Sequence, residues 1–147
     1  MTNINHLVSR DSATVSALLM IWEGSVKATH TFLSDKEISD IKPEVYQALQ
    51  TIAILCCYED EHGVPQGFIG IDKQKIALLF VAENAREHGI GRCLVSEAIE
   101  KWQVNSVDVN EQNEQGLGFY QHMGFHIVSR SEVDAQGRPF PILHLAR

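Results

Sequence analysis

The chain has 147 residues, of which 44% are hydrophobic and 21% are charged, and its formal net charge is −7. This length predicts a single domain over residues 1–147, and the negative charge disfavours binding to nucleic acid, because such binders carry basic surfaces. The N-terminus lacks the pattern of a signal peptide and no apolar run is long enough to span a bilayer, so we expect a cytoplasmic protein without a membrane partner.

The first third of the chain reads as one strand followed by helices. A strand is predicted at residues 4–8, and a helix then begins at Asp11 or Ser12 and ends at Gly24. A loop leads to a short helix capped by Ser34, and Pro43 fits the first turn of another helix.

From residue 51 onward the composition changes, and the segments become rich in β-branched and apolar residues. Three strands, expected to pair antiparallel, are predicted at residues 51–59, 67–72 and 75–81. A helix at 90–102 and a strand at 104–109, near-parallel to the strand at 75–81, follow them. The chain then continues with a helix at 113–123 and two strands at 125–133 and 139–147. This order predicts a mixed sheet flanked by helices.

The three cysteines, Cys56, Cys57 and Cys93, all lie within apolar patterns. Their odd number and their spacing differ from those of a disulfide framework or a zinc site. We therefore predict core thiols and no metal site.

A glycine-bearing loop joins the strand at 75–81 to the helix at 90–102. Gly89 and Gly91 lack Cβ atoms, so a phosphate could reach the unpaired amides at the helix start, and Arg86 would add a charged contact. The alternative is a helix that merely starts with glycine. The spacing is neither that of a Walker loop nor that of the dinucleotide fingerprint.

Two motifs together resemble the GCN5-related N-acetyltransferase (GNAT) family. In "VAENAREHGIGR", Arg86, Gly89 and Gly91 match the family's Gln/Arg-x-x-Gly-x-Gly/Ala loop. In "NEQNEQGLGFYQHMGF", the later family motif is matched by Asn113, Phe119, Tyr120, Gly124 and Phe125, with Gly116 where the family often has alanine. The segments "SVKATHTFL" and "RSEVDAQGRPFPILHL" resemble a bacterial branch described as peptidyl-lysine acetyltransferases.

The resemblance implies an α/β (α+β) fold with a mixed, mostly antiparallel seven-stranded sheet, about four helices and a splayed central strand pair. It also implies acetyl-CoA as cosubstrate, with its pyrophosphate on the loop and its pantetheine arm between the strands at 75–81 and 104–109. The residues that would contact acetyl-CoA are Phe80, Val81, Arg86, His88, Gly89, Ile90, Gly91, Arg92, Asn113 and Tyr120.

In this family Tyr120 would be the acid that protonates the departing thiolate, and a backbone N–H near Val81 would hold the oxyanion. His30 and Trp22 would line the acceptor pocket. The general base stays open among Asp108, His30 and a chain of water molecules.

The implied function is acetyl transfer from acetyl-CoA to a primary amine by direct attack on the thioester. The amine could belong to a protein lysine, a peptide N-terminus or a small molecule. The alternative is a non-catalytic acyl-CoA-binding regulatory module. A different donor such as succinyl-CoA would need a basic residue near the thioester, and none is evident. The protein could be a monomer or a homodimer.

Overall fold

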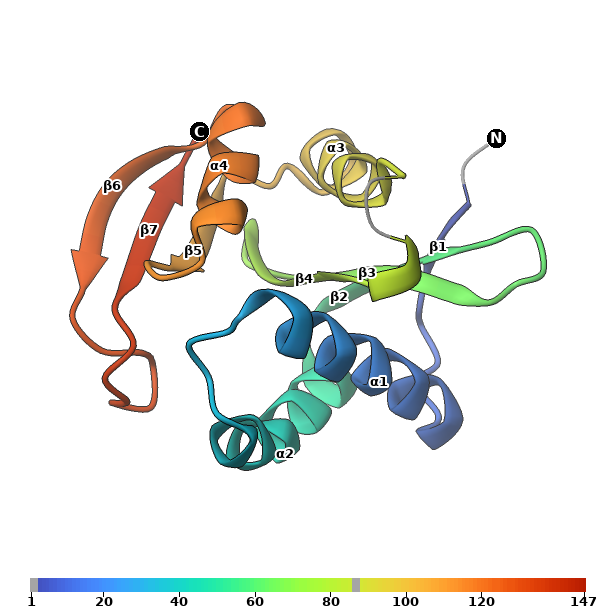
Figure 1. Ribbon diagram of the computed structural model, residues 1–147. Helices are drawn as coiled ribbons and strands as arrows, with labels where there is room; N and C mark the ends of the chain where they lie inside the picture. Colours follow the sequence, from blue (N-terminus) through green and yellow to red (C-terminus); the bar gives the residue numbers. More distant parts are fainter. Residues whose placement is uncertain (1–2, 86–87) are drawn as a thin grey trace.

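The computed structural model of the protein describes residues 3–85 and 88–147. A seven-stranded sheet in the order β1-β2-β3-β4-β5-β7-β6 separates α1 and α2 on one side from α3 and α4 on the other (Figure 1). The mixed α+β fold expected from the sequence is thus confirmed. The elements are β1 (Ile4–His6), α1 (Ser12–Thr29), α2 (Asp35–Thr51), β2 (Ile54–Glu59), β3 (Pro65–Asp72), β4 (Lys75–Val81), a 3₁₀ turn (Glu83–Ala85), α3 (Ile90–Trp102), β5 (Ser106–Asn110), α4 (Glu114–His122), β6 (His126–Ser131) and β7 (Ile142–Ala146).

Helix α1 is longer than predicted. It begins as expected, with the Asp11 carboxylate accepting a hydrogen bond from the Thr14 amide, but it continues through Gly24 to Thr29. Glycine costs about 1 kcal/mol in a helix, and burial of Val26 on the far side of Gly24 offsets that cost. The extra turn carries the end of α1 to the central strands of the sheet.

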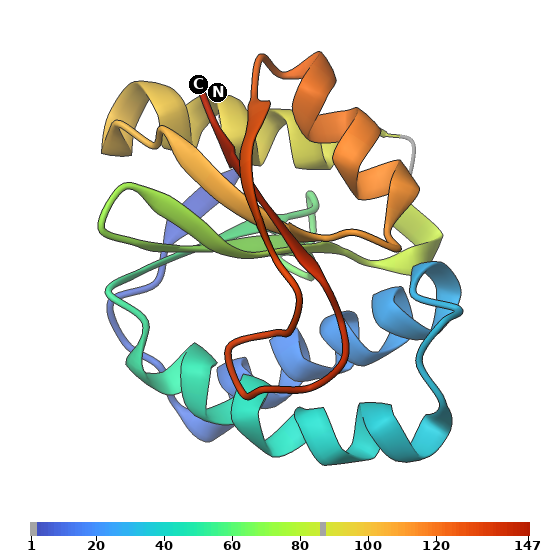
Figure 2. The same cartoon turned by 90° about the vertical axis from the view of Figure 1, so that its left-hand side faces the viewer.

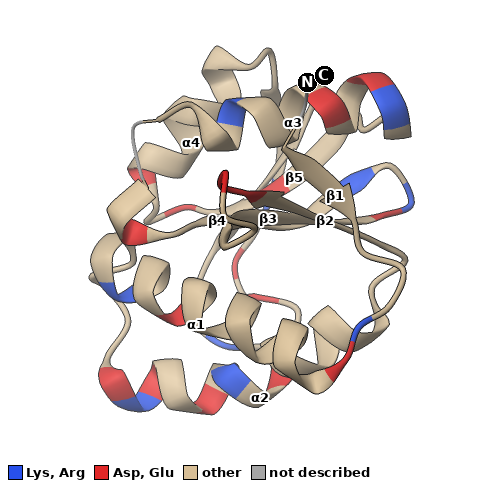
Figure 3. Ribbon diagram, turned by 90° about the vertical axis from the view of Figure 1, so that its right-hand side faces the viewer, with Lys and Arg blue, Asp and Glu red and all other residues tan. Residues whose placement is uncertain are grey.

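Helix α2 is a single helix, so the prediction of two separate helices here was wrong. Ser34 caps it in a complete capping box with Glu37, and Pro43 lies inside it. Pro43 removes one backbone donor, but Ile38 and Val45 on either side of it are both buried against the sheet. Charged positions lie along α2 (Figure 3), and Lys42 pairs with Glu23 of α1 at 3.0 Å.

Strands β1 to β4 form an antiparallel sheet with a core on each face. One core joins the sheet to α1 and α2 and includes Leu18, Leu55 and Phe68; the other joins it to α3 and α4 and includes Ile69 and Val95. Strand β2 begins later than predicted because α2 extends to Thr51. Cys56 and Cys57 are buried as expected, but Cys93 is exposed on α3, so the core prediction was wrong for that thiol.

The central strands β4 and β5 diverge, in agreement with the splayed central strand pair that the family resemblance implies. They run parallel, and within the described chain they pair only at Lys75–Ser106 and Ile76–Val107. Beyond Ile76, β4 keeps its antiparallel partner β3 up to Val81. The side of β4 that faces β5 is therefore open along Leu78 to Val81.

The β6–β7 hairpin turns away from the plane of the other strands, and its loop reaches back to α2 (Figure 2). Arg138 of this loop pairs with Glu44 of α2 at 3.0 Å, and Phe140 packs against Phe32 at 6.1 Å between ring centroids. These contacts hold the hairpin loop beside the α1–α2 connection. No helix in the described part of the chain is long and apolar enough to cross a membrane.

Candidate active site

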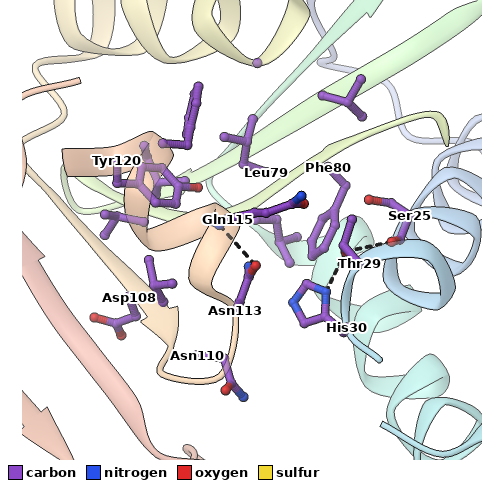
Figure 4. A pocket seen from close by; sticks show the side chains of 18 of the residues that line it. Ser25, Thr29, His30, Leu79, Phe80, Asp108, Asn110, Asn113, Gln115 and Tyr120 are labelled. Atoms are coloured by element: carbon purple, nitrogen blue, oxygen red, sulfur yellow. Dashed lines mark hydrogen bonds between the residues drawn. The ribbon is translucent and has the colours of Figure 1, made fainter. Parts of the chain in front are cut away.

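A pocket lies where β4 and β5 part, with a volume of about 270 Å³ (Figure 4). Ligand pockets usually measure roughly 300–1,000 Å³, so this space suits part of a ligand rather than a large cofactor. Four elements meet here: the C-terminal halves of β4 and β5, the end of α1 and the first turns of α4. The polar side chains around it belong to Ser25, Thr29, His30, Asp108, Asn110, Asn113, Gln115 and Tyr120.

A second pocket adjoins the first at the start of α3. Both are lined by Val81, Gly91 and Phe119, so together they form a continuous path from the parted strands to the helix N-terminus. Gly89 is the N-cap of α3 in the left-handed conformation, with φ of 75°, and it offers no side-chain cap. The first amides of α3 therefore lack a capping oxygen, which suits an anion.

The fold itself does not require glycine at position 91. A Cβ built there would lie 3.6 Å from Cζ of Phe119 and 3.9 Å from Cγ2 of Val81, which are ordinary van der Waals distances. Glycine at this position is accounted for if a ligand must approach the backbone of α3 more closely than an alanine would allow.

The remaining predicted contacts are distributed over the two pockets and a third. Phe80 and Val81 line the first pocket, and Arg92, which is exposed, lines the second. Ile90 is buried beneath the second pocket, whereas His88 lines a separate one beside Asn84 and Tyr58. Arg86 lies outside the described residues.

Trp22 differs from its prediction. Its side chain is 3% exposed and packs within the core between α1, α2 and the sheet, and it does not line the pocket between β4 and β5. Leu18 and Val26, on the same face of α1, are buried with it. This position gives Trp22 a packing role, and we do not retain it on the acceptor side.

Tyr120 extends from α4 into the pocket (Figure 4). The residue is 8% exposed, and Phe119 and Phe125 contact its ring edge-on at 5.2 and 5.8 Å. Burial raises the pKa of Tyr120 well above its usual value near 10, since a phenolate would be poorly solvated there. The hydroxyl thus stays protonated and able to donate at every working pH.

Asn113 is the N-cap of α4, and its side-chain oxygen accepts a hydrogen bond from the Gly116 amide at 3.0 Å. A Cβ at position 116 would lie 2.4 Å from Nδ2 of Asn113. The departure from the family's alanine at this position therefore has a local reason: glycine leaves room for the capping amide on the wall of the pocket.

His30 ends α1 on the opposite side of the pocket from Tyr120 (Figure 4). Its Nδ1 lies 2.8 Å from Oγ1 of Thr29, and its ring packs on Phe32 at 5.3 Å. Burial lowers the pKa of His30 below 6.5, because the imidazolium loses solvation. The ring is therefore neutral near pH 7.

This lowered pKa has a consequence for stability. Between the folded-state pKa and about 6.5, the unfolded chain binds a proton at His30 that the folded protein does not, so acid favours unfolding. We expect the free energy of unfolding to fall more between about pH 7 and pH 5 in the wild type than in His30→Gln. Urea denaturation at several pH values measures this, with the exposed-loop variant His62→Gln as control. An identical pH dependence in wild type and His30→Gln would contradict the burial effect.

Asp108 also lines the pocket, which the sequence pattern could not decide. Its Oδ1 accepts from Nδ1 of His144 at 2.8 Å, and its Oδ2 pairs with the Lys75 ammonium. Since a carboxylate only accepts, Nδ1 of His144 carries a hydrogen, and its Nε2 lies 2.7 Å from the Ser131 hydroxyl oxygen. Sequence reasoning missed His144 and Ser131, because only the pairing of β5, β7 and β6 brings them to Asp108.

Comparisons with known proteins agree with this geometry. Residues 50–127 match the model of an acetyltransferase (GNAT) domain. The chain is 40% identical to the peptidyl-lysine N-acetyltransferase YjaB of Escherichia coli (strain K12), over 88% of this chain and 87% of that protein. The solution structure of the apo form of YjaB from Escherichia coli superposes with a TM-score of 0.87 at 38% identity, covering 97% of this chain and 96% of that one.

A more distant structure shares the fold. The PaiA N-acetyltransferase of Thermoplasma acidophilum, solved in complex with coenzyme A, superposes with a TM-score of 0.70 at 19% identity, covering 98% of this chain and 99% of that one. The seven-stranded sheet and the parted central strands thus belong to a fold that occurs in acetyltransferases.

Proposed function

Because this chain belongs to the GNAT acetyltransferase family and is an N-acetyltransferase, we propose that its donor is acetyl-CoA and its acceptor the side-chain amine of a lysine in a peptide or protein. The observation that carries the proposal is the path between the parted strands β4 and β5 and the start of α3. An acetyl group at the parted strands and a pyrophosphate at α3 would lie at its two ends.

On the donor side, the pantetheine arm would occupy the opening between β4 and β5. The backbone of Phe80 and Val81 would pair with the arm's amides, since this edge of β4 lacks β5 as a partner. The pyrophosphate would bind the amides of Gly89 to Arg92, with Arg86 and Arg92 supplying positive charge. Asn113 would contact the arm from the α4 side. His88, in a separate pocket, would reach only the outer part of the cofactor.

On the reacting side, the acceptor amine attacks the thioester carbonyl carbon. The C–N bond forms as the C–S bond breaks, and Tyr120 donates its proton to the leaving sulfur. A backbone N–H near Val81 would stabilise the oxyanion. Burial makes the phenol a weaker acid, but the same burial also penalises a free thiolate, so the leaving sulfur has more need of a proton there than in water.

The relatives named for peptidyl-lysine acetylation support lysine as the acceptor. Thr29, His30 and Asp108 offer polar groups on the side of the pocket opposite α3, where an acceptor would enter, and the aromatic rings of Phe32 and Phe140 lie beside it. A lysine side chain has an apolar stem and a polar tip, which matches such a surface.

Thiol release with acetyl-CoA tests the proposal. The acceptors are a peptide with one lysine and a blocked N-terminus, the same peptide with acetyl-lysine, a peptide with only a free N-terminus, and small amines. We expect turnover with the lysine peptide and none with its acetylated form. Cofactor binding without turnover on any amine would favour the regulatory module, and a preference for succinyl-CoA would overturn the donor assignment.

Replacement of Gly91 by alanine is expected to weaken acetyl-CoA binding at least about tenfold while leaving the fold intact. The added methyl fits beside Phe119 and favours the helix by about 1 kcal/mol, but it occupies the space that the pyrophosphate needs. Calorimetric titration and thermal unfolding measure both effects. Gly118→Ala, on α4 with nothing within 4 Å of its Cβ, is the matched control and should bind normally. Unchanged affinity in Gly91→Ala would exclude this phosphate site.

A further inference from the structure

We propose that His30 is the general base of this enzyme, with Nε2 accepting the proton that the acceptor ammonium must lose before it attacks the thioester. The inference rests on the proposed function and deepens it. It assigns to one side chain the role that the sequence leaves open among His30, Asp108 and water.

The hydrogen bonds of Thr29 determine the tautomer of His30. The Thr29 hydroxyl lies 2.8 Å from the Ser25 carbonyl oxygen and 2.8 Å from Nδ1 of His30. A hydroxyl has one hydrogen, and a carbonyl oxygen can only accept, so that hydrogen goes to Ser25. The Thr29 oxygen must then accept from Nδ1–H of His30. The proton on the ring is therefore on Nδ1, and Nε2 carries a free lone pair.

His30 is also well placed in the pocket relative to Tyr120. His30 lies across the pocket from Tyr120, and Nε2 faces the open space between them (Figure 4). Thr29 on one side and the Phe32 ring at 5.3 Å on the other fix the plane of the imidazole. A base and an acid on opposite sides of a pocket suit a reaction in which one removes a proton from the nucleophile and the other protonates the leaving group.

Asp108, the other candidate base in this pocket, is already engaged by neighbouring side chains. His30, Asp108 and Tyr120 are the titratable side chains among the described residues that line this pocket. Tyr120 is held protonated, and Asp108 already uses one oxygen for His144 and the other for Lys75. A carboxylate engaged on both oxygens is a poor proton acceptor.

The protonation states of the acceptor lysine and of His30 at pH 7 also call for a base of this kind. At pH 7 a lysine is neutral in only about one molecule in a few thousand, given its usual pKa near 10.4. Burial lowers the pKa of His30, so the ring is neutral at pH 7 and the lone pair on Nε2 is unoccupied by a proton. A lysine ammonium that entered the same pocket would lose solvation as well, which would lower its pKa and favour the loss of its proton.

The proton balance of the complete step is as follows. The ammonium gives one proton to Nε2 of His30, and the amine forms the C–N bond with the carbonyl carbon. The C–S bond breaks, Tyr120 gives its proton to sulfur, and the second proton lost by nitrogen restores the Tyr120 hydroxyl. The products are the acetyl-lysine amide, free coenzyme A thiol and one proton, which His30 releases to solvent.

The test compares pH profiles of kcat/KM for the blocked single-lysine peptide with acetyl-CoA. With His30 as base, the wild-type profile falls on the acid side below the pKa of His30 and is level from about pH 7 to 9. In His30→Gln, kcat at pH 7 should fall about 10²-fold. Its kcat/KM should instead rise with slope one toward the lysine pKa. Imidazole should restore part of the activity of His30→Ala, and affinity for acetyl-CoA should be unchanged in both variants.

His62→Gln, in an exposed turn, is the matched control and should match the wild type. A second readout needs no acceptor: ¹⁵N spectra of the His30 ring should show hydrogen on Nδ1 and none on Nε2 at pH 7. Hydrogen on Nε2, or an unchanged pH profile in His30→Gln, would overturn the inference. Absence of wild-type turnover with every amine would instead count against the proposed function, and the ring tautomer would still decide whether His30 can act as a base.

Discussion

Turnover is expected to fall at least about tenfold when Tyr120 is replaced by phenylalanine, because the leaving thiolate then lacks its proton donor. General acid catalysis typically contributes about 10²–10⁴-fold, and water can replace part of it. The ring contacts with Phe119 and Phe125 remain, so the fold and the affinity for acetyl-CoA should be retained. Steady-state kinetics, supported by single-turnover rates that isolate the chemical step, measure the effect.

Phe125→Leu is a useful companion to this variant, because it changes the packing beside Tyr120 at a residue that does not line the pocket, and it keeps the hydroxyl. We expect it to change stability more than turnover. Full activity of Tyr120→Phe, with chemistry shown to limit the rate, would remove Tyr120 from the mechanism and leave it as a core residue.

Replacement of Phe125 by alanine is expected to lower the free energy of unfolding by about 3–5 kcal/mol. Phe125 is fully buried, and its ring supports Tyr120 at 5.8 Å from the side away from the pocket. For a chain of this length the midpoint of thermal unfolding should fall by roughly 10 °C. Chemical denaturation and calorimetry measure both quantities.

Ile127→Ala is the control for this prediction, since that side chain is 47% exposed on the neighbouring strand and should change stability by less than about 0.5 kcal/mol. A loss of under about 1 kcal/mol in Phe125→Ala would show that the core beneath Tyr120 repacks around the cavity. In that case the position of the Tyr120 hydroxyl would depend on α4 alone.

Much of the fold could be predicted from local patterns. The ranges of β4 and α3 were predicted without error, because each has an uninterrupted apolar pattern with clear flanks. The errors in the helices occurred at Gly24, where local propensity favours a helix end, and at Pro43, where it favours a helix start. Burial of residues beyond them, such as Val26 and Val45, outweighs that propensity. The burial of these residues depends on tertiary packing, which a short stretch of sequence does not reveal.

The candidate site divides in the same way. The family motifs predicted residues that line the pockets, including Tyr120, Asn113 and Gly91, because they occur at fixed spacing. Trp22 was misplaced because an aromatic residue on an amphipathic helix gives no sign of which helix face borders a pocket. The contact of Asp108 with His144 spans 36 residues of sequence, and both this contact and the one with Lys75 depend on strand pairing, which local sequence does not encode.

The divergence of β4 from β5 also bears on how the molecule is held together. On the side of α1 and α2, the core includes residues of β2, β3 and β4 but none of β5, β6 or β7. The two parts of the sheet are joined by two residue pairs, by the core under α3 and α4, and by the contacts of the hairpin loop with Glu44 and Phe32. A ligand that filled the gap between β4 and β5 would add contacts between the two parts of the sheet, so the cosubstrate would also have a structural role. Since a ligand that binds only the folded state stabilises it, we expect the midpoint of thermal unfolding to rise when the cosubstrate is bound.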